Sequence, residues 1–481
     1  MPVPLFRLAA VLLLASGAPA LAQPLAPEAA RDALPDPRPV VLTGAEVPAL
    51  LGEAPEAVRA LAVQNGVLAP IPVQVDERFV YDIAVAYADL DPRRCARASW
   101  CRDVAGHVVE LGYADPGTQV GPDPDATLDA DDEIALMLAD FGPRAEAPPP
   151  GAVEIEAASG GTARYAYLIA DAARAAPAPD SDPGAPEPHV VYAPAFARGE
   201  YLATYDRGGR EPPMFMSWLY GYPSGNRPGN NPETTALATD HYRLGFTDRW
   251  ILSEMRIGGS ADLLDVDMVA FAPGACPRSP YTASLSEGGF LVNRAGPVRA
   301  IRRVVGFNSG PLAELQWVMY ARTAESRAAL RVHPIPGAMS YLDLTPEAHG
   351  AIYRNAAYPL GVLIDGRRDV TLKHSAPDWE TVTGEGWAYA VLHETEVEGV
   401  DSLRVQTTYR DDREPRAPAC MIDDEDYIGA HGVWVRQRVP NTDPRRDGDL
   451  ASLALNRRFV FGGDPARSVE LLREPLAVTA R

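Results

Sequence analysis

Three side chains with complementary chemistry, Arg299, Tyr320 and His333, are spaced so that they can meet on one face of a sheet. A phenol and an imidazole can exchange protons with a substrate. An adjacent guanidinium lowers the free energy of a phenolate and can also hold a carboxylate through two parallel hydrogen bonds. This set therefore predicts acid/base chemistry on an acidic substrate.

The strands that must position these residues lie between residues 297 and 336, where apolar and polar residues alternate with a period of two. Such alternation, broken by turn signals at 308–311 and near 325–326, predicts a three-stranded antiparallel meander. With these turns Arg299 lies opposite Tyr320, and Tyr320 lies opposite His333, with Cβ atoms about 5 Å apart. A shift of the strand register by one residue would place the three side chains on opposite faces of the sheet.

The predicted polar face carries further cations that would serve as substrate-binding residues: Arg303, Arg322 and Arg331. The same pattern also fits a solvated, Arg-rich sheet face without catalytic function. The alternation by itself leaves both interpretations open, because a strand with one polar face is compatible with either.

The rest of the chain predicts an all-β protein. Short β-type runs recur from residue 189 onward, and the 47 prolines and 40 glycines suit an architecture with many turns. We expect a small N-terminal β-sandwich over 23–171 and a Pro/Ala-rich linker or loop over 172–188. A large antiparallel, supersandwich-like β-domain then covers 189–481.

Residues 1–22 have the features of a signal peptide, with Arg7, an apolar run and a small-x-small cleavage pattern. We therefore expect a periplasmic or secreted protein, and no later stretch is long and apolar enough to cross a membrane as a helix. The net charge of −21 argues against nucleic acid as a partner.

The four cysteines, an even number without metal-type spacing, suit an oxidising compartment. Four cysteines allow three pairings, of which we favour Cys95–Cys101 and Cys276–Cys420. Free buried thiols are the alternative.

Two further groups of residues could contact a carbohydrate. The loop before residue 242 offers aromatic faces for sugar rings and polar groups for hydroxyls. Its candidate substrate-binding residues are Trp218, Tyr222, Asn230 and His241. A long loop packed by its own aromatic side chains is the alternative. Asp378 and Glu380 are a candidate carboxylate pair for hydrolysis.

An acidic segment offers closely spaced oxygen ligands for calcium, at Asp123, Asp125 and Asp129. The segment does not match the EF-hand template, because it lacks the glycine at position six and the glutamate at position twelve. A solvated acidic turn is the alternative. Nucleotide-binding and haem motifs are also absent from the sequence, so we expect no cofactor, and calcium is the one candidate.

Two short segments resemble known modules. Pro72–Glu77 together with Leu128–Ile134 resembles a small β-sandwich unit of secreted bacterial proteins of unassigned function. Gly296–Ala300 resembles a strand signature of galactose-mutarotase-like supersandwich domains in carbohydrate-active enzymes. The second resemblance implies a concave, polar sheet face over which sugar chains bind.

From these features we expect an extracellular carbohydrate as the partner. The chemistry that fits the row is β-elimination on an acidic glycan by a polysaccharide lyase, since it needs a base, an acid and a carboxylate ligand. Tyr320 or His333 would remove the C5 proton, and Arg299 would hold the uronate. The alternative is a non-catalytic periplasmic or surface protein that binds carbohydrate or assists assembly.

Overall fold

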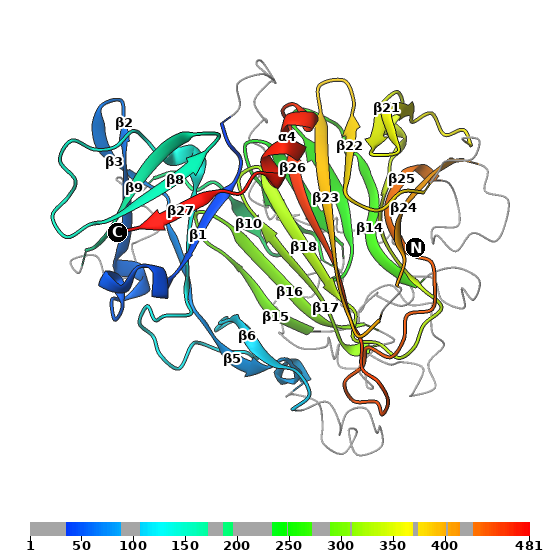
Figure 1. Ribbon diagram of the computed structural model, residues 1–481, viewed down its shortest axis with the longest axis horizontal. Helices are drawn as coiled ribbons and strands as arrows, with labels where there is room; N and C mark the ends of the chain where they lie inside the picture. The colour runs from blue at the N-terminus through cyan, green and yellow to red at the C-terminus, as the bar shows by residue number, and fades with distance from the viewer. Residues whose placement is uncertain are drawn as a thin grey trace, which may run out of the picture.

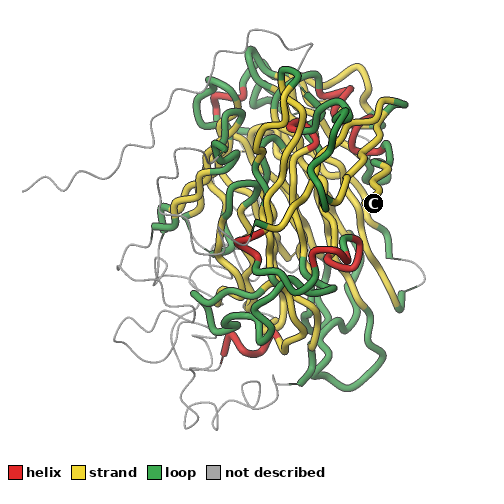
Figure 2. Tube along the Cα trace, turned by 90° about the vertical axis from the view of Figure 1, so that its left-hand side faces the viewer, coloured by secondary structure: helices red, strands yellow, loops and turns green. Residues whose placement is uncertain are grey.

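The structure is a computed structural model that describes residues 35–87, 106–171, 186–195, 233–247, 249–271, 289–307, 310–368, 374–400, 403–413 and 427–481. Strands dominate it, with short helical turns between them (Figure 2). The expected all-β, antiparallel architecture is confirmed. No helix within these ranges is long and apolar enough to cross a membrane.

The N-terminal residues, together with the last strand of the chain, form a three-stranded sheet, a five-stranded sheet and a two-stranded ribbon, at the left of Figure 1. We call these three sheets the N-terminal unit. The three-stranded sheet has the order β1 (Pro39–Thr43), β7 (Glu133–Met137), β4 (Gln74–Asp76), and the ribbon pairs β5 (Arg78–Asp82) with β6 (Val109–Tyr113). The five-stranded sheet has the order β27 (Ala477–Ala480), β8 (Val153–Ser159), β9 (Thr162–Ala170), β2 (Val58–Gln64), β3 (Val67–Ile71). Alternate residues of β2 are buried, as a strand with one apolar face requires.

Two large antiparallel sheets follow. The eight-stranded sheet has the order β10 (Val191–Ala193), β11 (Thr235–Ala238), β12 (Tyr242–Phe246), β13 (Leu252–Ile257), β14 (Leu264–Phe271), β19 (Ala338–Leu344), β25 (Tyr427–Val435), β24 (Val405–Asp412). The nine-stranded sheet has the order β15 (Gly289–Ala295), β16 (Ala300–Phe307), β17 (Gly310–Met319), β18 (Thr323–Ala329), β26 (Ser452–Phe461), β23 (Ala388–Glu398), β22 (Trp379–Thr383), β20 (Ile352–Asn355), β21 (Tyr358–Leu363).

The two faces of the nine-stranded sheet pack against different parts of the molecule. Leu315, Trp317 and Met319 of β17 belong to the large core shared with the eight-stranded sheet. On the opposite face, Leu312 and Val318 belong to a second core with N-terminal residues. The sheet is therefore buried on both faces where β15, β16 and β17 meet the N-terminal unit.

In the described ranges, helical structure is confined to short elements. The 3-10 turns are η1 (Gly44–Glu46), η2 (Pro48–Leu50), η3 (Pro55–Ala57), η4 (Ile83–Tyr87), η5 (Leu138–Asp140) and η8 (Pro346–Ala348). The α-helix α4 (Pro465–Arg473) starts after Asp464, whose side chain accepts a hydrogen bond from the Ala466 amide. Leu472 of α4 packs against Leu392 and Val460 on the outer face of the nine-stranded sheet.

After α4 the chain returns to the N-terminal unit, where β27 pairs with β8. The C-terminal end of the chain therefore lies beside the blue and cyan strands in Figure 1. Arg481 strengthens this contact, because its backbone exchanges two hydrogen bonds with Glu154. The last strand thus ties the two parts of the molecule together.

Candidate functional site

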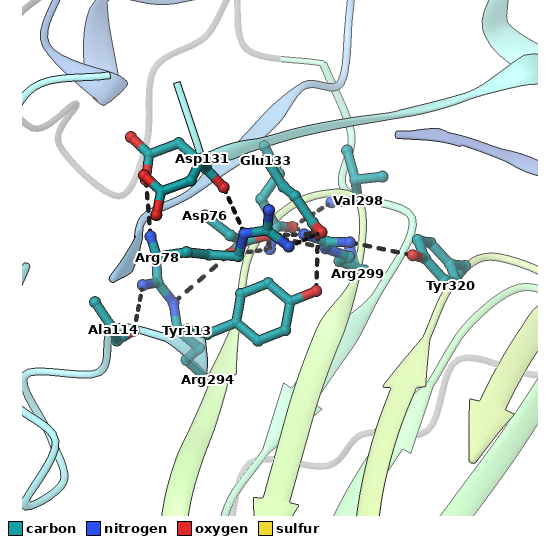
Figure 3. Close-up of polar contacts among 12 residues, drawn as sticks. Asp76, Arg78, Tyr113, Ala114, Asp131, Glu133, Arg294, Val298, Arg299 and Tyr320 are labelled. Carbon is teal, nitrogen blue, oxygen red and sulfur yellow. Dashed lines mark hydrogen bonds and ion pairs between the residues drawn. The ribbon is translucent and has the colours of Figure 1, made fainter. Parts of the chain in front are cut away.

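The predicted pairing of Arg299 with Tyr320 is observed. In the β16–β17 hairpin Ala300 lies opposite Met319. Arg299, which precedes Ala300, therefore lies opposite Tyr320, which follows Met319. Arg299 Nη1 donates a hydrogen bond of 3.2 Å to the Tyr320 hydroxyl, as Figure 3 shows. The local alternation therefore predicted the register of this hairpin correctly.

Arg299 does not lie on an open, polar sheet face of the kind that the resemblance implies. Its Nε donates to Asp76 at 2.8 Å and its Nη2 donates to Glu133 at 2.7 Å (Figure 3). The Arg299 guanidinium also lies over the Tyr113 ring, 5.4 Å from its centroid, and the residue is 1% exposed. The charge is thus neutralised by N-terminal carboxylates, and Arg299 has no access to a uronate in this arrangement.

Tyr320 is buried as well, and burial raises the pKa of its phenol well above the usual range despite the adjacent Arg299. The phenol therefore keeps its proton at neutral pH. Since its oxygen also accepts the hydrogen bond from Arg299, Tyr320 is in no position to remove a proton from a substrate here.

His333 does not join the row, which corrects the predicted second hairpin. Glu325 and Ser326, expected in the link, lie inside β18, and the turn comes instead at residues 320–322. The backbone oxygen of Arg331 lies against Gly310, at the opposite end of β17 from Tyr320. Ten residues of strand place His333 roughly 30 Å from the Arg299–Tyr320 contact.

Two of the other predicted arginines are buried structural groups. Arg303 forms a bidentate ion pair with Glu314 at 2.9 Å. Arg322 donates to three backbone oxygens, those of Pro35, Phe461 and Gly462. Arg331 differs, because it lines an open cavity on the outer face of the nine-stranded sheet.

Of the loop residues expected to bind sugar, Trp218, Tyr222 and Asn230 lie outside the described residues, as do Cys95, Cys101, Cys276 and Cys420. His241 is half-buried at the start of β12, and burial lowers its pKa to about 4, so the ring is neutral at neutral pH. The predicted disulfides remain predictions.

The acidic segment uses its carboxylates to close its own turns. Asp123 accepts from the amide of Asp125, Asp125 from that of Thr127, and Asp129 from that of Asp131. Within the described ranges, no group of three or more ligating side chains is arranged to hold a metal ion. The calcium prediction for Asp123, Asp125 and Asp129 therefore gains no support from this geometry.

A different set of acid/base residues meets between the two large sheets. Tyr353, Glu380 and His393 come from β20, β22 and β23, and they face the eight-stranded sheet. The His393 imidazole Nε2 lies 2.8 Å from Glu380 Oε2, and the Tyr353 hydroxyl donates to Glu380 Oε1 at 2.6 Å. Asn355 donates in turn to the Tyr353 hydroxyl at 2.9 Å. We call these four residues, with Tyr389 and His431, the inter-sheet cluster.

Hydrogen bonding determines which nitrogen of His393 carries the proton. Because the Glu380 carboxylate can only accept, Nε2 must be the N–H donor when the ring is neutral. The other nitrogen, Nδ1, is then a bare acceptor, and it has no hydrogen-bond partner among the described residues. His393 is therefore oriented by a carboxylate and keeps an unused lone pair, the arrangement of an activated base.

The facing sheet contributes His431, the other fully buried histidine of the chain. Its Nδ1 lies 2.7 Å from the Gly429 carbonyl oxygen, so Nδ1 is the donor. Burial lowers the pKa of His431, which keeps the ring neutral and leaves Nε2 to accept from the Tyr389 hydroxyl at 3.1 Å. Burial also raises the pKa of Tyr389 well above its usual range, so this phenol holds its proton.

Tyr409 lies at the boundary between the inter-sheet cluster and the surface. It belongs to β24, the edge strand of the eight-stranded sheet, and is half-buried. Its ring stacks on Tyr353 with 4.5 Å between centroids. Tyr409 therefore links the inter-sheet cluster to a partly exposed position on this strand.

The sequence alone named one member of this cluster, Glu380, but paired it with Asp378. In the structure Asp378 directly precedes β22 and forms a surface ion pair with Arg473 of α4. The available signal was the alternation Tyr389, Val391, His393, which places a phenol and an imidazole on one face of β23. What the pattern could not provide was the partner strand.

Comparison with known proteins yields little. No family model matches the chain, and no curated protein sequence matches it significantly. Among solved structures, the heparan sulfate lyase HepC of Pedobacter heparinus is 7% identical over 49% of this chain and 34% of the lyase, with a TM-score of 0.28. The match thus spans about half of this chain and about a third of the length of that lyase.

Two smaller proteins show a similar slight likeness. A protein of Escherichia coli K12 described as an aldose 1-epimerase is 11% identical over 46% of this chain and 96% of its own, with a TM-score of 0.28. The Slr1438 protein of Synechocystis sp. PCC 6803 is 12% identical over 50% of this chain and 99% of its own, also at 0.28. Likenesses this weak carry no argument about the function of this chain.

Proposed function

We propose that the protein is carbohydrate-active and cleaves an acidic polysaccharide by β-elimination at the inter-sheet cluster. The observation that supports this is the state of His393, whose Nε2 is held by Glu380 while its Nδ1 has no partner in the described part of the chain. An oriented base is one of the three groups that this β-elimination requires, together with an acid and a ligand for the sugar carboxylate.

In the proposed reaction His393, oriented by Glu380, is the base, and Tyr389, hydrogen-bonded to His431, is the acid. His393 Nδ1 takes the proton from C5 of the uronate, and the electrons of the C5–H bond form the C4=C5 double bond. The bond between C4 and the glycosidic oxygen breaks, and that oxygen takes the proton of Tyr389. Return of the proton from His393 to the Tyr389 phenolate, directly or through water, restores the enzyme.

Substrate access requires a movement at the edge of the sheet. Glu380 and His431 are 0% exposed, so no sugar can reach them while the Tyr409 ring stays on Tyr353. Rotation of an exposed or half-exposed side chain is fast on the time scale of catalysis. In this proposal the Tyr409 ring is displaced when the glycan binds along β24.

The test is the appearance of unsaturated product, followed by its ultraviolet absorbance, across a panel of acidic polysaccharides. Removing a positioned base costs about 10²–10⁴ in rate, so His393→Ala should abolish measurable product. His349→Gln is the matched control, because His349 is exposed and its ring lies against Arg413, with 3.4 Å between Nδ1 and Nη2, rather than in the cluster. Wild-type protein that gives no unsaturated product from any acidic glycan would end the lyase proposal.

The complete burial of the cluster favours a second candidate, a non-catalytic protein that binds carbohydrate. A hydrogen-bonded group of polar side chains between two sheets can also serve to specify how the core packs. In that case His393→Ala lowers the free energy of unfolding, and the wild-type protein binds acidic glycans without changing them. Glycan binding measured together with product formation separates the two candidates.

A further inference from the structure

A cavity of about 220 Å³ opens on the outer face of the nine-stranded sheet, where β18, β23 and β26 run beside His107 of the N-terminal unit. This face is opposite to the one that carries the inter-sheet cluster, because Glu396 lies three residues beyond His393 on β23. Ligand sites are frequent where two parts of a protein meet. We call this cavity the crease pocket.

The crease pocket owes its depth to two short side chains. Ala329 of β18 lies directly opposite Ala454 of β26, and Ala454 lies opposite Glu396 of β23. All three residues line the cavity. The alanines therefore form a floor, and longer side chains stand around it.

Arg327 and Glu396 form a polar side of the pocket, with Nη2 and Oε2 3.1 Å apart. Their side chains are 39% and 53% exposed, and an ion pair this exposed contributes little to stability. A carboxylate from a ligand can therefore replace Glu396 at Arg327 with little loss. Glu396 would retain its hydrogen bond from the Asn456 amide, at 2.8 Å.

Arg331 provides a second, fixed cation. Its guanidinium donates to the Leu312 carbonyl, Glu314 and Glu110, at distances of 2.9 to 3.2 Å. A guanidinium has five N–H donors, so these contacts leave two available for a ligand. Because the three contacts hold the group in place, little side-chain entropy is lost when the remaining donors bind.

The remaining wall is apolar. Val108, Leu450 and Leu453 line the cavity, and Leu450 is 53% exposed at its rim. A sugar ring has the matching pair of surfaces, with C–H groups on its faces and polar groups around its edge. The pocket thus combines the fixed guanidinium of Arg331, the guanidinium of Arg327 whose carboxylate partner can be replaced, and an apolar wall. This combination fits a single acidic sugar residue.

We propose that the crease pocket binds one uronate residue, with its carboxylate on Arg327 and its ring against Leu450. The expected ligand class rests on the proposed action on an acidic glycan, but the site is independent of the inter-sheet cluster. It would hold the glycan to the protein at a place distinct from the place of cleavage.

The experiment is calorimetric titration of the full chain with methyl glucuronoside and methyl galacturonoside, and with methyl glucoside as the neutral counterpart. Binding of a uronoside with no binding of the glucoside is the expected result. Arg327→Gln should weaken binding about tenfold or more, the effect of losing one charge-assisted hydrogen bond. Arg473→Gln is the control, because this arginine is similarly exposed but lies on α4.

Ala454→Phe tests the pocket without changing any charge, since it fills the floor, and it should abolish uronoside binding. His393→Ala should bind as the wild type does, which separates the failure of this proposal from the failure of the lyase. Absence of uronoside binding, equal binding of the glucoside, or equal weakening by Arg327→Gln and Arg473→Gln would each overturn the proposal.

Discussion

His393 and Glu380 are diagonal neighbours across two strands, and this relationship orients the imidazole. Glu380 lies opposite Val391, and His393 is two residues further along β23 on the same face. Diagonal neighbours of this kind are within reach of long side chains, and the contact measures 2.8 Å. Tyr353 approaches Glu380 in the same way from β20, since it lies opposite Val382.

The first prediction concerns the carboxylate of Glu380. Glu380→Gln keeps the shape of the side chain but removes the charge that orients His393, so the rate of unsaturated product formation should fall by about 10²-fold or more. The measurement is product absorbance with time. A loss of stability alone would lower the amount of folded protein without changing the rate per folded molecule, so far-ultraviolet circular dichroism is recorded in parallel.

The second prediction is that Arg299 matters for stability. Arg299→Met leaves the buried Asp76 carboxylate without its ion-pair partner at 2.8 Å and leaves Glu133 paired with Arg78 alone, which should lower the free energy of unfolding by about 3–5 kcal/mol. Urea unfolding measures the change. Arg467→Met serves as the control, because Arg467 is on the surface of α4 and such substitutions change stability by about 0.5 kcal/mol or less.

Tyr320 gives the third prediction. Tyr320→Phe removes one hydrogen bond to Arg299 and should cost about 1 kcal/mol. Because Tyr320 lies at the interface with the N-terminal unit, any glycan-cleaving activity should be unchanged. A Tyr320→Phe protein that is folded but inactive would return the catalytic role to the Arg299–Tyr320 pair.

The fourth prediction is a pH dependence at the acidic turn. The hydrogen bond between Asp131 and Asp129, together with burial, raises the pKa of Asp131 from 3.8 to about 6. A carboxyl with a raised pKa binds its proton more tightly in the folded state, so stability falls as the pH rises through this interval. The loss is complete above about pH 6.

Asp131→Asn removes this loss. It should therefore raise the melting temperature at neutral pH, by a stabilisation on the order of 1 kcal/mol, and have no such effect below about pH 4. Thermal unfolding at both pH values is the measurement. The control is Asp125→Asn, on an exposed residue of the same segment. Equal effects of Asp131→Asn at the two pH values would contradict the raised pKa of Asp131.

The sequence by itself determined the all-β class and the register that places Arg299 against Tyr320. Both depend on local information, namely the alternation of apolar residues and the position of one turn. The error at His333 arose from the same source, because a displaced turn moves every residue that follows it.

Only the tertiary structure decided what covers the polar face of β16 and what gathers between the sheets. Asp76 pairs with Arg299 across 223 residues, and His431 meets Tyr389 from the opposite sheet. The sequence does not distinguish an arginine that is buried against carboxylates from one that is exposed to water. Alternation specifies which side of a strand a residue occupies, whereas long-range packing specifies whether that side meets solvent, substrate or another strand.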